Sequence, residues 1–133
     1  MLQCTAVRQL PFRETLAQVL TCEDPPDRPV LLAAGHALCE LAERHDADHA
    51  HHLWEHLSPD HALWFRWNDT AHRFQSLRWC TALRGDDETC GLYADHPPPH
   101  SWDVHDPSRD AVLDEITTDP ERWGLPPDPL QEP

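Results

Sequence analysis

The sequence predicts a mainly α protein: a small helical domain of about three helices, a Cys/His loop, and a Pro-rich acidic tail with one short helix. Apolar residues recur at spacings of three and four from residue 12 to residue 78, and prolines stand where helices would begin or end. Nine of the 14 prolines lie between Pro97 and Pro133, where acidic residues outnumber basic ones. We therefore predict a helical body at 1–79, a zinc clip at 80–105 and an acidic tail at 106–133.

The first two helices are predicted on either side of a proline-rich linker. Residues 12–22 place apolar side chains at helical spacing, and the following "EDPPDRP" stops that helix. A second, long helix is predicted from Pro29, a first-turn proline, to about Leu57, where Ser58 and Pro59 end it. Its apolar stripe consists of Leu31, Ala34, Leu38, Leu41 and Ala42.

A third helix is predicted over residues 59–79, with Ser58 as its cap. Its apolar residues are again spaced by threes and fours: Leu63, Trp67, Ala71, Phe74 and Leu77. The alternative is a hairpin that turns at Asn68 and Asp69, since "LWFRW" has the aromatic content of a strand. In either structure we expect Trp64, Trp67 and Phe74 to serve the core.

The tail is expected to hold one short helix. Asp106 would cap it, Pro107 would stand in its first turn, and Val112, Leu113 and Ile116 would form its apolar face. The end, "DPERWGLPPDPLQEP", reads as an extended segment whose Trp123 and Leu125 could dock on a partner or on the body. No internal repeat stands out beyond an echo of "HAL" at His36 and His61.

Composition limits the classes of function. A formal charge of -14, without a single lysine, opposes direct binding to nucleic acid and favours a protein partner with a basic surface. No apolar run is long enough to cross a bilayer, so no membrane role is expected. Five cysteines without regular spacing argue against a disulfide framework, and together these features predict a cytoplasmic protein. The use of arginine without lysine suits a GC-rich genome, such as that of an actinobacterium or its phage.

The stretch "CTALRGDDETCGLYADHPPPHSW" carries the candidate metal site. Zinc is held most stably by four thiolate and imidazole ligands, which Cys80, Cys90, His96 and His100 would supply. H-x3-H is a common zinc-finger spacing, whereas Cys80 and Cys90 need a turn at "RGDDET" to bring them together. Four protein ligands leave no position for a water, so such a zinc would be structural. The alternative is that Cys80 is a buried residue at a helix end, that Cys90 is incidental, and that the two histidines are simply two of the 11 in a His-rich chain.

The segment "CGLYADHPPPHSW" resembles the short C-x-L-P-x-G-H-x-G-P-H stretches of predicted actinobacterial and actinophage proteins. The matching positions are Cys90, Leu92, His96, Pro99 and His100, with Cys80 upstream. The resemblance implies a zinc-knuckle-like clip and covers only Cys80 to Trp102. Tyr93 and Asp95 replace its usual proline and first glycine, and Pro98 replaces its second glycine.

A second group of histidines lies in "RHDADHAHHLWEH". On the predicted long helix His45, His49, His52 and His56 would fall on one face. That face could bind a metal, line the core, close a homodimer or give a pH-sensitive contact. His52, Glu55 and His56 also fit H-x-x-E-H, in which two histidines bind zinc and the glutamate acts as general base.

The leading hypothesis is a small acidic zinc-binding module that binds another macromolecule and is more a binding protein than an enzyme. If a phage encodes it, an adaptor or inhibitor of a basic host protein would suit the charge. The alternative is a small metal-dependent hydrolase built on His52, Glu55 and His56.

Overall fold

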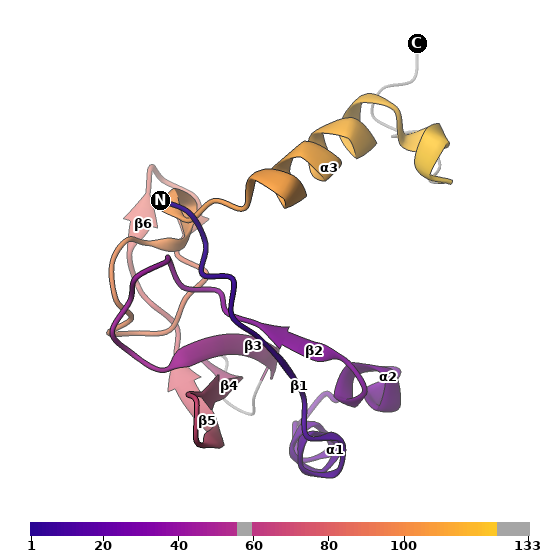
Figure 1. The fold of residues 1–133 in the computed structure, drawn as a ribbon, viewed down its shortest axis with the longest axis vertical. Coiled ribbons are helices and arrows are strands. Elements are labelled where there is room, and N and C mark those ends of the chain that lie inside the picture. Colours follow the sequence, from indigo (N-terminus) through magenta and orange to yellow (C-terminus); the bar gives the residue numbers. More distant parts are fainter. Residues whose placement is uncertain (56–59, 125–133) are drawn as a thin grey trace.

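The computed structural model describes residues 1–55 and 60–124, and over these residues the protein is mainly β (Figure 1). They form three antiparallel sheets, β1-β2, β3-β4-β5 and β6-β7, and two short helices lie in the connection between β1 and β2. The elements are β1 (Val7–Gln9), α1 (Phe12–Leu20), α2 (Pro29–Ala33), β2 (His36–Leu38), β3 (His49–Glu55), β4 (His61–Trp67), β5 (His72–Arg78), β6 (Leu83–Arg84), β7 (Glu88–Thr89), η1 (Ser101–Asp103), α3 (Pro107–Thr118) and η2 (Pro120–Trp123). The predicted helical body is therefore wrong.

The central strand β4 is buried on both of its faces. The Trp64 side chain is fully buried against Trp79 and Tyr93, with ring centroids 5.9 and 5.4 Å away. The next residue, Phe65, points to the other face, where it contacts His72. Because both faces need apolar residues, β4 lacks the alternation of apolar and polar residues that identifies a half-buried strand, and its spacing imitates a helix.

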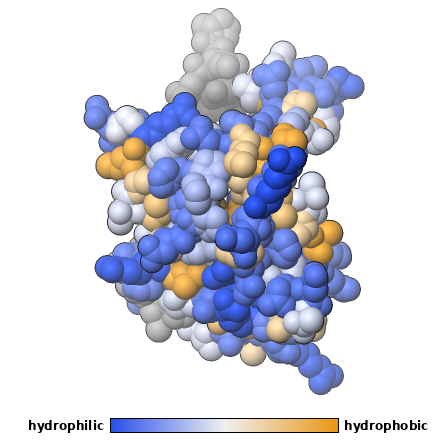
Figure 2. All heavy atoms as spheres, turned by 60° about the vertical axis from the view of Figure 1, so that its left-hand side comes forward, coloured by the Kyte–Doolittle hydropathy of each residue, from blue (hydrophilic) through white to orange (hydrophobic). Residues whose placement is uncertain are grey.

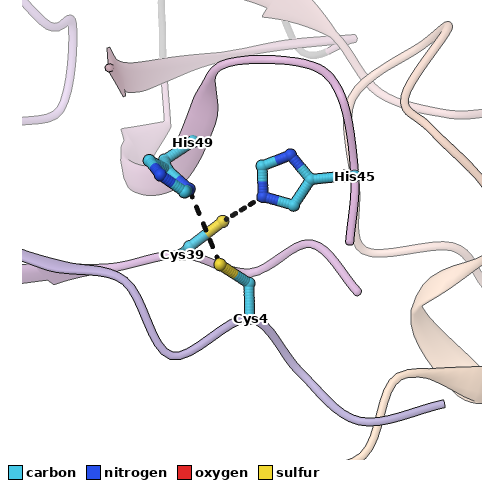
Figure 3. Close-up of side chains that lie close together, drawn as sticks. All are labelled: Cys4, Cys39, His45 and His49. Carbon is cyan, nitrogen blue, oxygen red and sulfur yellow. Dashed lines mark hydrogen bonds between the residues drawn. The ribbon is translucent and has the colours of Figure 1, made fainter. Parts of the chain in front are cut away.

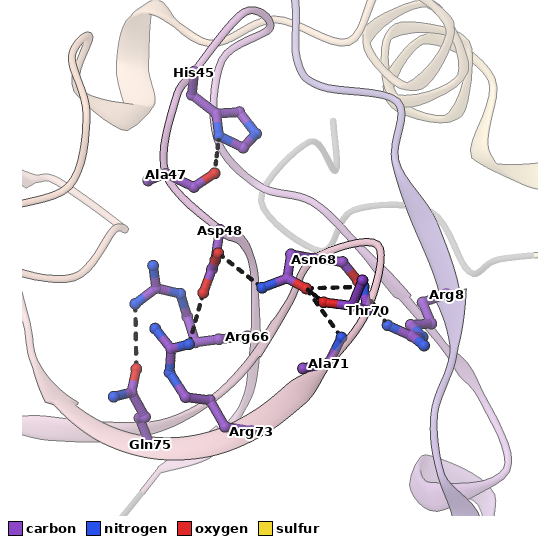
Figure 4. Close-up of polar contacts among 10 residues, drawn as sticks. All are labelled: Arg8, His45, Ala47, Asp48, Arg66, Asn68, Thr70, Ala71, Arg73 and Gln75. Carbon is purple, nitrogen blue, oxygen red and sulfur yellow. Dashed lines mark hydrogen bonds and ion pairs between the residues drawn. The ribbon is translucent and has the colours of Figure 1, made fainter.

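Strands β4 and β5 form the hairpin that was the alternative to the third helix. Trp67 pairs with His72, and the Asn68 side-chain oxygen accepts hydrogen bonds from the Thr70 and Ala71 amides at 2.9 and 3.0 Å (Figure 4). This Asx-type turn explains why asparagine stands there. The alternative prediction of a turn at Asn68 and Asp69 is thus the correct one.

The predicted long helix of residues 29–57 is also wrong. A helix does begin at Pro29, but it ends at Ala33, and the chain continues as β2, a loop and β3. Long-range backbone hydrogen bonds hold this path, since the Cys39 amide donates to Ala6 and the Glu40 amide to Ala50. The four histidines consequently share no helix face, and His56 lies, with Leu57, Ser58 and Pro59, outside the described residues.

Helix α1, which the sequence predicts, contacts the β3-β4-β5 sheet through individual side chains. His72 Nε2 lies 2.7 Å from the Glu14 carboxylate, and the Trp54 indole N–H donates to the Asp24 carbonyl at 2.6 Å. Val19 on α1 is fully buried. The Tyr93 ring packs against Trp64, on the face of the sheet opposite to Phe65.

The tail helix α3 begins as predicted. The Asp106 carboxylate accepts hydrogen bonds from the amides of Ser108 and Arg109 at 3.1 and 3.2 Å, and Pro107 follows the cap. The helix leads away from the sheets in Figure 1, and none of its residues is buried. Leu125 lies outside the described residues. Among the described residues, no helix has the length and apolar character needed to span a bilayer.

Candidate metal centres

The structure brings together Cys80, Cys90, His96 and His100, here called the C-terminal cluster. Strand β5 ends at Arg78, just before Cys80, and the β6-β7 hairpin returns the chain so that the Cys90 amide donates to the Ala82 carbonyl at 3.1 Å. Gly85 supports the tight turn with a φ of 65°. The nine-residue separation of the two cysteines is therefore closed by a hairpin.

The potential ligand atoms of the C-terminal cluster all lie within 4.8 Å of one another. Cys90 Sγ lies 3.4 Å from His96 Nε2, and Cys80 Sγ lies 3.6 Å from His100 Nδ1. His96 Nδ1 lies 2.8 Å from the Pro97 carbonyl oxygen, which can only accept, so Nδ1 carries the proton. Its Nε2 lone pair then faces the cysteines, as a metal ligand requires.

The backbone of the C-terminal cluster is left-handed directly before its first histidine. Asp95 stands where the C-x-L-P-x-G-H-x-G-P-H motif has its first glycine, and it has a left-handed φ of 67°. Aspartate tolerates this conformation better than most residues do. The Ser101 amide also donates to Cys90 Sγ at 3.4 Å, a bond that stabilises a thiolate.

A second group, here called the N-terminal cluster, consists of Cys4, Cys39, His45 and His49 (Figure 3). Its potential ligand atoms likewise lie within 4.8 Å of one another. Cys39 Sγ lies 3.5 Å from His45 Nε2, and Cys4 Sγ lies 3.6 Å from His49 Nδ1. His45 Nδ1 lies 2.8 Å from the Ala47 carbonyl oxygen, so Nε2 is again the nitrogen that faces a thiol (Figure 4).

Burial affects the pKa of one cysteine thiol in each cluster. It raises the pKa of Cys39 to about 11, although amide hydrogen bonds from Ala50 and Leu41 act in the opposite direction. Burial also raises the pKa of Cys80. At neutral pH these two groups are thiols in the absence of metal, and a bound cation would have to displace their protons.

Glu40 and Gly91, which directly follow Cys39 and Cys90, line a common cavity of about 100 Å³. The chain segments that carry the two clusters thus meet at one small cavity. Burial raises the pKa of Glu40 to about 7, while the His52 amide and the charge of Arg109 lower it.

Sequence reasoning found the C-terminal cluster and missed the N-terminal one. It placed His45 and His49 on a helix with His52 and did not connect them with Cys4 or Cys39. One signal could have found them: Cys39, His45 and His49 have the spacing C-x5-H-x3-H, which recurs in Cys90, His96 and His100. Cys4, by contrast, is remote in sequence and is brought close only by the pairing of β1 with β2.

The H-x-x-E-H residues are not arranged as a zinc protease site. That motif needs a helix to bring its histidines to one face, but His52 and Glu55 lie on strand β3. The His52 ring packs between Trp64 and Trp79, with centroids 5.5 and 5.2 Å away. Its Nε2 is buried without a hydrogen-bond partner, 3.9 Å from a Glu55 oxygen.

The fold and its two clusters define a small mainly β protein with two Cys2His2 groups, each of which could hold a metal ion. The ligand types suit Zn²⁺, without identifying it. No family model, curated protein or solved structure matches the chain.

Proposed function

We propose that the protein is a small acidic zinc-binding module that binds another protein, and that a structural zinc is held by Cys80, Cys90, His96 and His100. The convergence of two thiols and two imidazoles within 4.8 Å carries the proposal. Four protein ligands fill a tetrahedral zinc, so the metal would have no position for a reactive water. Its role is to fix the end of β5 and the β6-β7 hairpin against the sheet.

Charge and exposure support an interaction role. The chain has a net charge of -14, and the face shown in Figure 2 is mostly hydrophilic, with separate small apolar patches. Helix α3 carries Asp110, Asp114 and Glu115 together with exposed Val112 and Leu113, which are 41% and 52% accessible. Such a surface is suited to binding a protein with a basic surface, and its negative charge opposes binding to nucleic acid. The free cysteines suit the reducing cytoplasm.

Metal content tests the zinc part of the proposal. Protein purified without a metal column should contain zinc, and Cys90→Ser should lose the zinc of the C-terminal cluster while Cys22→Ser, a buried cysteine outside both clusters, should not. Protein that folds without any metal would contradict the proposal.

Capture from the native host tests the interaction part. A variant with Asp110→Asn, Asp114→Asn and Glu115→Gln keeps the shape of α3 and removes its three acidic charges. We expect the wild type to retain a basic protein that this variant releases at lower salt, because exposed charge pairs are screened by salt. Equal retention by both forms would remove α3 from the proposed interface.

A further inference from the structure

We infer that Cys4, Cys39, His45 and His49 form a second zinc site, because the chain contains the same Cys2His2 unit twice. This inference rests on the proposed zinc site of the C-terminal cluster. It corrects the sequence-based expectation that the chain has no internal repeat beyond "HAL".

The hairpins of the two units have the same register. In the first unit Val7, three residues after Cys4, pairs with Leu38, the residue before Cys39. In the second unit Leu83, three residues after Cys80, pairs with Thr89, the residue before Cys90. A shift of one residue in either hairpin would turn its side chains to the other face, so shared register is a specific likeness.

The backbone hydrogen bonds around the cysteines correspond one by one. Cys4 donates to Leu41 at 2.8 Å, and Cys80 donates to Leu92 at 2.8 Å. The second cysteines behave alike, since Cys39 donates to Ala6 at 3.0 Å and Cys90 to Ala82 at 3.1 Å. A third pair of bonds, both of 2.8 Å, joins Glu43 to Leu2 and Ala94 to Arg78. The isolated bridges Gln3↔Ala42 and Trp79↔Tyr93 also occupy equivalent positions.

The potential ligand atoms of the two units also occupy equivalent positions. The first histidine of each unit turns Nε2 to the second cysteine, and the second histidine turns Nδ1 to the first cysteine. An aromatic ring packs against the second histidine in both units: Trp67 lies 5.2 Å from His49, and Trp102 lies 4.9 Å from His100. Identical donors in one geometry select the same metal, so zinc at one cluster predicts zinc at the other.

The two units differ chiefly in the loop of the hairpin. Residues 85–87 join β6 to β7, whereas residues 10–35, which contain α1 and α2, join β1 to β2. The helical segment is thus an insertion in the first unit, and it separates Cys4 from Cys39 far beyond the usual spacing of a ligand pair. Loop insertions of this kind leave the ends of a hairpin in place.

Counting zinc in the full chain tests the inference and separates it from the proposed function. We expect two zinc ions in the wild type and in Cys22→Ser, and one in each of Cys39→Ser and Cys90→Ser. A single zinc in the wild type, lost with Cys90→Ser and kept in Cys39→Ser, would overturn the second site and leave the proposed function standing. Metal-free wild type would overturn both. If Cys39→Ser does not fold, the wild type and Cys90→Ser decide: two zinc ions in the wild type support the inference, and a single zinc that is lost with Cys90→Ser refutes it.

Discussion

Arg44 and Asp95 adopt the same left-handed backbone conformation, with φ values of 63° and 67°, and each directly precedes the first histidine of its cluster. The left-handed conformation is sterically unfavourable for arginine, less so for aspartate, and not for glycine. The shared conformation aims His45 and His96 at Cys39 and Cys90.

The first prediction follows from this strain. Arg44→Gly should raise the free energy of unfolding of the zinc-loaded protein by about 0.5 kcal/mol, because the relief of roughly 1 kcal/mol of strain exceeds the added unfolded-state entropy. Asp95→Gly should gain less, and Arg44→Val should be destabilising. Urea unfolding measures these differences. Glu43→Gly, at a neighbouring position without positive φ, is the matched control and should destabilise the protein. A loss of stability with Arg44→Gly would contradict the left-handed conformation of Arg44.

The second prediction concerns the inserted helices. Val19→Ala on α1 should lower the free energy of unfolding by about 2 kcal/mol, because Val19 is fully buried. The zinc content should stay at the wild-type value, since no residue of α1 belongs to either cluster. Denaturant unfolding and metal analysis of the same sample check both parts. Loss of zinc from the N-terminal cluster would show that the insertion belongs to the metal site.

The third prediction is a pH dependence that originates at His52. Burial lowers the pKa of this imidazole, although Glu55 acts in the opposite direction. As pH falls through the ordinary histidine pKa of about 6.5, His52 takes up a proton in the unfolded chain before it does so in the folded protein. This residue therefore lowers the free energy of unfolding at acid pH. Stability associated with neutral His52 is therefore present above that pH and is lost as pH falls towards the folded pKa.

His52→Phe and His52→Gln should both remove this contribution. As the pH is lowered from 7.5 to 5.5, the unfolding free energy of each variant should therefore rise relative to that of the wild type. Protonation of the cluster histidines affects all three proteins and cancels in the difference. A difference that does not change with pH would show that His52 titrates alike in the folded and unfolded chains.

The fourth prediction concerns the cap of α3. Asp106→Ala removes the acceptor of two amide hydrogen bonds and should cost about 1 kcal/mol of helix stability. Hydrogen exchange over residues 107–118 should accelerate roughly five-fold, the change that 1 kcal/mol implies. Because α3 has no buried residue, the urea midpoint of the body should not move. Asp106→Asn keeps the cap and should exchange like the wild type; an equal acceleration with Asn would point to charge as the cause.

Local signals predicted where two of the helices begin, but not the length of the first of them. Pro29 and Pro107 begin helices in the structure, and Asp106 caps α3. The strands were missed because β4 is buried on both faces and because Leu31, Leu38 and Leu41 only imitate a helical stripe. The long-range pairing of β1 with β2 determines the structure of residues 36–38, and a local window of sequence does not contain both strands.

The same distinction explains the metal clusters. All four ligands of the C-terminal cluster lie within one short stretch, so their spacing predicted the group. The N-terminal cluster repeats the spacing of Cys39, His45 and His49, but the insertion at 10–35 hides Cys4 from any spacing rule.

The central claim is that one Cys2His2 unit occurs twice and binds zinc in the same way both times. Long-range ¹H–¹⁵N spectra of the histidine rings in the wild-type protein test it most directly, because they show which ring nitrogen carries the proton and which is bound to metal. We predict metal on Nε2 of His45 and His96 and on Nδ1 of His49 and His100. The claim would be contradicted if His96 and His100 were bound to metal while the rings of His45 and His49 exchanged between tautomers, as free imidazoles do.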